Sequence, residues 1–512
     1  MAPKLPVRQL LILAICRFSE PLVFTSVLPY LPELLEYVGV AKADVAKWAG
    51  ITSAAAALSQ AFTAVSWGTL SDYVGRKPVI LFGLTCTMVL SVVLGMSQSL
   101  TTVLISRTMI GLMNGNVGIL RTMVAEIVPE RELQPRAFSI MPTVWTIGSI
   151  FGPSFGGALA HPAEKYPNIF GSSEFLRRFP FALPNLISAC VFIFGITVGF
   201  LFLHETLETK KDQRDVGLEI GKVLTGSCTS RRKGDLERKA VDEESASLLP
   251  KSSLKSSKKD QPIKRVSHSW SQIFTFQSSI ILVAYTLMSG FGMAFDSVFP
   301  VFLHYPVQQL HENLDVNLPF KFASGFGVDS QTIGTYYTII GIIGMFIQFY
   351  LFPPVVKRYG VLKCYQVSAI CMPIIFLLTP FTALVPGVLR TPVVIFVMLA
   401  KLSTTIFGIP CCTILLTNSA SSMAVLGTLN GVGTSFSALG RAAGPAVIGS
   451  AFSYGVKEGY VLFPWWLLSA LALWGILPGL WIIEQEGPSR AVLEEEDADI
   501  EYGQGNESED GY

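Results

Sequence analysis

Long apolar stretches separated by short polar segments dominate the sequence. A helix that crosses a hydrocarbon core of about 30 Å needs about 20 residues, since each residue adds about 1.5 Å. By that criterion the chain contains about twelve candidate membrane-spanning helices, with half of them on each side of a long polar segment. We expect them at residues 9–32, 46–70, 78–97, 100–126, 137–160, 180–203, 276–303, 331–353, 363–386, 391–416, 423–452 and 461–483. The pattern predicts an all-α membrane protein with two six-helix bundles.

The polar stretches divide the chain into four parts. Residues 1–207 form the expected N-terminal bundle and residues 270–483 the C-terminal bundle. Residues 208–269 are rich in Lys, Ser, Asp and Glu and cannot bury enough apolar surface to fold, so we expect a disordered cytoplasmic linker. Residues 484–512 are acidic, and we expect a second disordered segment there.

Composition and charge agree with a membrane protein. Half of the residues are hydrophobic, only 15% are charged, and the mean hydropathy is +0.50; a soluble domain carries about 25% charged residues. Basic residues such as Arg76, Lys77, Lys357 and Arg358 fall in short loops on one side of the predicted bundles, which places both termini in the cytoplasm. The sequence has no nucleotide-binding loop, metal-ligand cluster or catalytic constellation. We therefore expect no cofactor, no metal, no nucleic-acid partner and no enzymatic activity.

A conspicuous polar loop is predicted between the second and third spans, where residues 67–78 read WGTLSDYVGRKP. Gly68 and Gly75 are expected to permit a tight turn and close backbone approach. Asp72 is expected to accept hydrogen bonds from the amides at a neighbouring helix N-terminus. Arg76 and Lys77 hold this loop in the cytoplasm.

The two halves of the sequence resemble each other. The run FTSVLP at residues 24–29 parallels FDSVFP at 295–300, and the glycine–proline pattern at 148–157 parallels that at 440–449. Such repeats predict two halves related by an axis along the membrane normal. Glycines four residues apart allow close helix packing, and a proline kinks the helix beside them. The expected packing hinge comprises Gly148, Gly152, Pro153, Gly156, Gly157, Gly440, Gly444, Pro445 and Gly449.

Several charged residues lie inside the predicted spans, at a cost of about 2.5–3.5 kcal/mol each at a helix centre. They must face a polar cavity or each other. Glu20 and Asp296 are the candidate proton carriers, because a carboxylate beside a cavity can bind and release a proton. A fixed salt bridge is the alternative: Arg17 lies three residues before Glu20 on the same helix face, and Lys401 could pair with Asp296 or contact an anionic substrate.

The remaining polar candidates fall into two groups. The expected substrate cavity contains Arg17, Thr25, Asn114, Asn116 and Lys401, although an asparagine can equally make an interhelical hydrogen bond. The expected cytoplasmic gate, which would stabilise the outward-facing state, contains Gly68, Asp72, Gly75, Arg76, Lys77, Arg121, Glu126 and Arg136.

These motifs resemble those of a known family. The loop at residues 67–78 is similar to the signature of the major facilitator superfamily, and the pattern at 148–157 is similar to the motif of its drug:proton antiporters. Together with Ser139, both runs resemble the zinc-induced facilitator-like subgroup, in its fungal form. The resemblance implies transport by alternating access. It also implies that Arg107 assists proton transfer, the alternative being that its side chain snorkels to water.

The linker contains a further motif. Glu244, Leu248 and Leu249 resemble an acidic dileucine sorting signal that a sorting adaptor would bind, although a chance match is equally compatible with this Ser-rich segment. We therefore expect a location in the vacuolar or the plasma membrane.

The sequence thus predicts a secondary active transporter, a monomer in the lipid bilayer, that exports a small molecule in exchange for protons. One alternative is a proton-coupled symporter for nutrient uptake, in which proton and substrate move in the same direction. The other is a membrane receptor that binds a ligand without transporting it. The substrate itself is not specified by the sequence.

Overall fold

The computed structural model describes residues 6–128, 134–207, 210–211, 213–225, 274–308, 316–420 and 423–485, which are almost entirely helical. The first half contains α1 (Val7–Tyr37), η1 (Lys42–Asp44), α2 (Val45–Val74), α3 (Arg76–Gly95), α4 (Leu100–Met113), α5 (Asn116–Ile127), α6 (Gln134–Leu159), α7 (Pro162–Lys165), α8 (Pro167–Phe170), α9 (Glu174–Arg178), α10 (Ala182–Phe202) and α11 (Val216–Leu224). The second half contains α14 (Phe276–His304), α15 (Ser330–Phe346), η2 (Ile347–Leu351), α16 (Phe352–Tyr359), α17 (Val361–Leu378), η3 (Thr379–Leu384), α18 (Gly387–Asn418), α19 (Met423–Lys457), α20 (Leu462–Trp474) and α21 (Leu477–Trp481).

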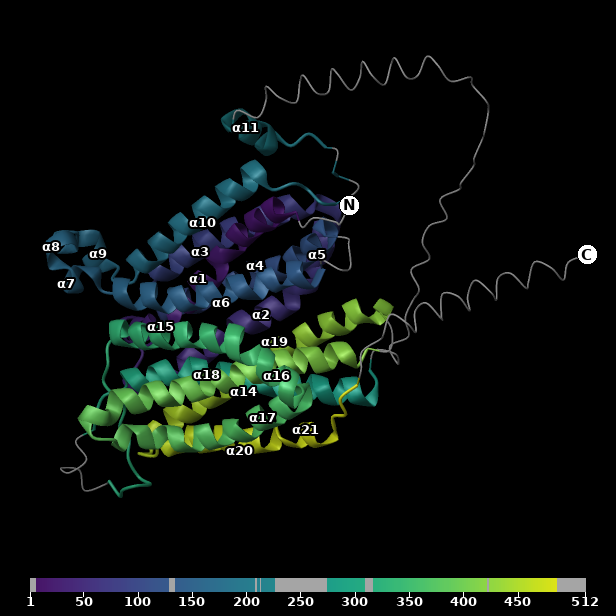
Figure 1. Ribbon diagram of the computed structural model, residues 1–512. Helices are drawn as coiled ribbons and strands as arrows, with labels where there is room; N and C mark the ends of the chain where they lie inside the picture. The colour runs from purple at the N-terminus through teal and green to yellow at the C-terminus, as the bar shows by residue number, and fades with distance from the viewer. Residues whose placement is uncertain are drawn as a thin grey trace, which may run out of the picture.

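These helices confirm the predicted fold class. Within the described residues, nine helical segments are long and apolar enough to cross a membrane. The long helices α2, α6 and α19 occupy the three remaining predicted positions, which gives twelve spans in the expected order. In Figure 1 the first half, in purple and blue, lies beside the second half, in green and yellow.

Glycines of α6 determine how the first bundle packs. Gly148, Gly152 and Gly156 lie so close to α1 that a Cβ atom at any of them would overlap Pro21, Thr25 or Ser26. The second bundle repeats this arrangement, since a Cβ at Gly440 or Gly444 of α19 would overlap backbone oxygens of α14. The repeat seen in the sequence thus corresponds to two equivalent helix pairs, α1 with α6 and α14 with α19.

Helices α6 and α19 also join the two halves to each other. Gly157 of α6 lies against the backbone of Ser330 in α15, and Gly449 of α19 lies against Ala46 in α2. Pro153 and Pro445 belong to the same contacts, because their carbonyls face Gly334 and Gly50. Helices α6 and α19 therefore each use one set of glycines to pack against a helix of their own half. A further glycine, closer to the C-terminal end of each helix, packs against the other half.

Polar contacts reinforce this junction. We call the end of the bundle that carries the turn at Gly75 the loop end, and the opposite end the far end. At the far end, Glu33 accepts a hydrogen bond from the Ser330 amide at 2.6 Å, and Lys165 donates to the Ser330 hydroxyl at 3.2 Å. Lys457 pairs with Asp44 at 2.5 Å. The described contacts thus hold the two halves together at the far end.

One expectation about the linker is wrong. Residues 208–269 were expected to be disordered, yet helix α11 lies within that segment. Asp215 caps its N-terminus by accepting from the Leu218 amide at 3.2 Å, and Gly217 and Gly221 pack on the carbonyls of Phe200 and Leu201 in α10. A nine-residue helix is too short to be stable by itself, and this one is stabilised by packing on α10, which composition does not reveal.

The contact at Gly157 predicts how the far end responds to a larger side chain at that position. Gly157→Leu should separate α6 from α15, because the Leu side chain has no space against the Ser330 backbone. Spin labels at the exposed residues Glu164 and Gln331 should report a longer distance between the halves. Gly118→Leu is the matched control, since nothing lies within 4 Å of a Cβ there. An unchanged label distance in Gly157→Leu would show that this contact does not close the far end.

Candidate functional site

The segment expected to be a loop is mostly helix. Helix α2 continues to Val74, and Gly75 alone makes the turn, with φ of 115°, before α3 begins at Arg76. A side chain at φ 115° would be strained, so glycine is required at this position. Gly68, by contrast, has nothing within 4 Å of a Cβ, and the close approach expected for it is absent from this conformation.

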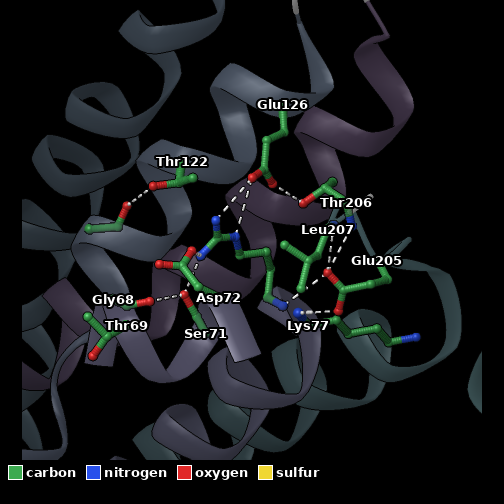
Figure 2. A network of polar contacts seen from close by, with 12 residues as sticks. Gly68, Thr69, Ser71, Asp72, Lys77, Thr122, Glu126, Glu205, Thr206 and Leu207 are labelled. Carbon is green, nitrogen blue, oxygen red and sulfur yellow. Dashed lines mark hydrogen bonds and ion pairs between the residues drawn. The ribbon is translucent and has the colours of Figure 1, made fainter. Parts of the chain in front are cut away.

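Arg76 is the centre of a polar network at the loop end, and Figure 2 shows its partners Ser71, Asp72 and Glu126. Its buried guanidinium pairs with Asp72 at 2.6 Å and with Glu126 of α5 at 3.2 Å, and donates to the Ser71 hydroxyl at 2.5 Å. Glu126 also accepts a hydrogen bond from the Thr206 hydroxyl, beyond the end of α10. The network thus joins α2, α5 and the segment after α10, all in the first half.

Glu205 performs the function that was expected of Asp72. Its carboxylate accepts hydrogen bonds from the backbone amides of Arg76 and Lys77, both at 3.0 Å, and so caps the N-terminus of α3 (Figure 2). A negative charge at a helix N-terminus is favoured by the helix dipole. The expectation for Asp72 was wrong, because its side chain lies on the last turn of α2 and pairs with Arg76 instead.

The second half repeats this cap. Gly360 makes a turn with φ of 87°, and Glu484 accepts from the amides of Val361 at 3.1 Å and Leu362 at 3.4 Å. Sequence reasoning missed both Glu205 and Glu484. A signal was available, since each is an acidic residue that lies three positions after the last span of its half ends.

Lys77 connects the network to α11. Its buried ammonium donates to the Phe200 carbonyl at 2.8 Å and to the Asp215 carboxylate at 2.6 Å. Partial burial raises the pKa of Asp215, but the hydrogen bonds from Lys77 and from the Leu218 amide, together with the charge of Lys77, outweigh this and hold the pKa below its usual value. Asp215 therefore stays ionised and paired.

The fourth span is broken in its middle. Helix α4 ends at Met113 and α5 begins at Asn116, and the indole of Trp67 lies against Gly115, where a Cβ would overlap it. The Trp67 Nε1–H donates to the Leu112 carbonyl at 2.7 Å, so the break does not leave that carbonyl unpaired. Discontinuous helices place backbone and side-chain polar groups inside a bilayer at transporter binding sites.

The break brings Asn116 to Glu20. Asn116 Nδ2 donates to Glu20 Oε1 at 2.7 Å, and Arg17 forms an ion pair with the other carboxylate oxygen. Glu20 is only 1% exposed. The guanidinium of Arg17 also lies over the ring of Trp145, at 5.3 Å. The first half therefore holds a fully covered acid–base pair beside the broken span.

Arg107 lies about two turns before the break. It is 2% exposed, and its guanidinium lies over the ring of Phe24 at 5.6 Å. Its burial contradicts the alternative in which the side chain snorkels to water. Its Nε has no hydrogen-bond partner within the described part of the chain.

The second half holds an ion pair that is more exposed than the pair of Arg17 and Glu20. Lys401 of α18 donates to Asp296 of α14 at 2.5 Å. The Lys401 side chain is 5% exposed, whereas that of Asp296 is 36% exposed. In the repeat, Asp296 corresponds to Thr25, whose hydroxyl donates to the Pro21 carbonyl of its own helix at 2.8 Å. The Thr25 hydroxyl also lies 3.5 Å from the Gly148 carbonyl, so this residue, which was expected in the cavity, contributes to the contact between α1 and α6.

The structure describes the other predicted residues only in part. Asn114 is buried at the break, and its backbone carbonyl accepts from Gln60 at 3.2 Å. Arg121 lies in α5 and Arg136 in α6, but their side chains fall outside the described part of the structure. Glu244, Leu248 and Leu249 lie wholly outside the described residues.

The contact at the break predicts the effect of changing Trp67. Trp67→Phe should lower the free energy of unfolding by about 1 kcal/mol, because Leu112 loses one of its two side-chain donors. Trp67→Ala should cost about 3 kcal/mol through the lost packing. Thermal unfolding of the purified protein tests this, with Trp474→Phe as a control at a residue that is 73% exposed. Equal effects of Trp67→Phe and the control would contradict the account.

The cap on α3 can be tested separately. Glu205→Gln removes the charge at the helix N-terminus and should destabilise the start of α3 by about 1 kcal/mol. Hydrogen exchange at the amides of Arg76 and Lys77 should accelerate accordingly. Asp72→Asn is the matched control, and a larger acceleration in that variant than in Glu205→Gln would restore Asp72 as the cap.

Comparisons with known proteins agree with this geometry. Residues 13–445 match the family described as Major Facilitator Superfamily. The chain is 36% identical over 511 residues to the major facilitator superfamily multidrug transporter mfsB of Aspergillus fumigatus, an alignment that covers 94% of this chain and 84% of that protein. It is 28% identical over 438 residues to protein ZINC INDUCED FACILITATOR-LIKE 1 of Arabidopsis thaliana, covering 85% of this chain and 81% of that protein.

Solved structures show the same fold. The human organic anion transporter MFSD10 (TETRAN) superimposes with a TM-score of 0.56 at 20% identity, covering 92% of this chain and 99% of the other. A D-xylose-proton symporter superimposes with a TM-score of 0.59 at 13% identity, covering 93% and 97%. The chain belongs to the major facilitator superfamily and is a multi-pass membrane protein that carries out secondary active transport.

Proposed function

We propose that this transporter exports a small molecule from the cytosol in exchange for protons, and that Asp296 carries the coupled proton. The observation that carries the proposal is the pair formed by Asp296 and Lys401, which lies inside the span region and is open on the carboxylate side only. A partly exposed carboxylate can exchange protons with water, while the covered amine keeps a charge that needs a partner.

The pair supplies a simple coupling step. While Asp296 is ionised, it neutralises Lys401 across the 2.5 Å contact. When Asp296 binds a proton, Lys401 loses its partner, and the balance of charge in the site changes by one unit. A conformational equilibrium can respond to that change, because an unpaired buried charge is strongly unfavourable. Lys401 is then free to contact an anionic group of a substrate.

Glu20 is placed differently. Arg17 and Asn116 occupy its two oxygens, and the carboxylate is almost completely covered. This arrangement favours a fixed acid–base pair in this conformation, so we assign proton transport first to Asp296 and treat Glu20 and Arg107 as supporting groups of the same pathway.

The arrangement of the halves supports alternating access. The described contacts between them extend from Thr146 and Gln348, near the middle, to the far end. If the loop end is cytoplasmic, as the basic residues there favour, this is the inward-facing state. The glycine contacts at Gly157 and Gly449 would then open when the halves rock.

Export is favoured by one relative in particular. The Aspergillus fumigatus protein, which aligns with nearly the whole of this chain, is named a multidrug transporter. We further propose a monomer with both termini in the cytoplasm of the vacuolar or the plasma membrane.

Purified protein in liposomes that contain a trapped pH dye tests the proposal. A proton gradient is imposed, and amphipathic cations, organic acids and zinc are added in turn. At least one should move protons in the direction opposite to its own, and Asp296→Asn should abolish that proton movement. Movement of protons and solute in the same direction would favour the symporter instead, and tight binding without any flux would favour the receptor.

A double variant separates a proton carrier from a structural ion pair. If the pair only stabilises the fold, Asp296→Asn combined with Lys401→Met should restore proton-coupled exchange, because no unpaired charge is left. If Asp296 carries the proton, the double variant should fold and move solute without protons. Restored coupling in the double variant would refute the assignment.

A further inference from the structure

Helix α11 is held beside the membrane-spanning part of the protein. Gly217 and Gly221 place its backbone against the carbonyls of Phe200 and Leu201, in the last turn of the span α10. Figure 1 shows α11 next to the end of α10, on the side of the first half that faces away from the second half. The helix thus lies at the depth where α10 leaves the membrane.

One face of α11 is apolar and uncovered. Its apolar residues follow the helical spacing i, i+4, i+7 and i+8 and are between 43% and 69% exposed. These residues are Val216, Ile220, Val223 and Leu224. Lys222 lies on another side of the helix, as the 3.6-residue period requires, and Glu219 borders the apolar face beside Val223. A helix of this kind buries its apolar face in an interface rather than in water.

The apolar face lies beside the exposed apolar surface of α10. Phe200 in the adjoining turn of α10 is 42% exposed, and other large apolar residues of that span are exposed as well, such as Ile193 at 54% and Phe194 at 61%. In a family whose members span the bilayer, that surface of α10 contacts acyl chains. The apolar side chains of α11 therefore extend the lipid-facing surface of α10 toward the headgroups.

The surroundings of α11 carry positive charge. Lys211 and Lys222 are exposed, and Lys77 lies beneath the start of the helix. The pKa of His204 is lowered, first by burial and then by the charges of Lys77, Lys222 and Arg8. Asp215, paired with Lys77, and Glu219, paired with Arg214, offset part of this charge, and the exposed Lys211 and Lys222 can pair with the anionic headgroups of a leaflet.

We propose that α11 is an interfacial helix that binds the bilayer leaflet at the loop end, with its apolar face among the upper acyl chains and Lys222 at anionic headgroups. This assignment does not depend on the transported solute or on proton coupling. Through Asp215, which caps α11 and accepts from Lys77, the helix joins the leaflet to the turn at Gly75. The start of the linker is thereby fixed to the membrane beside the first half.

Spin labels on the full-length protein test the proposal. A single cysteine is placed at Val223, on the apolar face, or at its neighbour Lys222, on the polar face, in a background without the native cysteines. The protein is reconstituted in vesicles of phosphatidylcholine and phosphatidylserine. Collisions of each label with oxygen, which partitions into lipid, are compared with collisions with a water-soluble nickel chelate.

The ratio of oxygen collisions to nickel collisions should be severalfold higher for the label at Val223 than for the label at Lys222. A label at a second apolar-face position, Ile220, should repeat the pattern against Lys222, which guards against one variant that disturbs the helix. Equal accessibility of both faces to nickel would overturn the proposal. Shielding of Val223 from both reagents, or spin–spin broadening, would also overturn it, because the face would then pack on protein or on a second copy.

Discussion

A charge inside a bilayer has to be neutralised, and this constraint organises the interior of the protein. Both halves solve it with one carboxylate and one basic side chain: Glu20 with Arg17 in the first, and Asp296 with Lys401 in the second. The two pairs differ in how far water reaches the acid. One carboxylate is covered and the other is partly exposed, so two similar pairs in one repeat fold support different functions.

The neutralised pairs depend on the helices that surround them. Asn116 reaches Glu20 only because the fourth span breaks, and the break is supported by Trp67 through the Leu112 carbonyl. Trp67 is the first residue of the motif at residues 67–78. The motif therefore performs two tasks, since its tryptophan supports the break while Arg76 and Lys77 build the network at the loop end.

The sequence predicted the spans well because each one is a long apolar stretch between polar residues, and a bilayer permits few alternatives. It also predicted the pairing of Lys401 with Asp296 as one of two possibilities. It could not predict the break at Asn114 and Gly115, which depends on an indole from another helix. The position of Glu205 just after α10 was a signal in the sequence, but only the fold shows that its carboxylate, rather than that of Asp72, reaches the amides of α3. Helix α11 was missed because its stability comes from contacts with α10.

The central claim is that Asp296 binds and releases a proton while Glu20 stays paired. Infrared difference spectroscopy of the protein in lipid measures this directly, because a protonated carboxyl absorbs separately from a carboxylate. As the pH falls, one carboxyl band should appear that is absent in Asp296→Asn and retained in Glu20→Gln. A band that persists in Asp296→Asn and disappears in Glu20→Gln would contradict the account and transfer the proton to the first half.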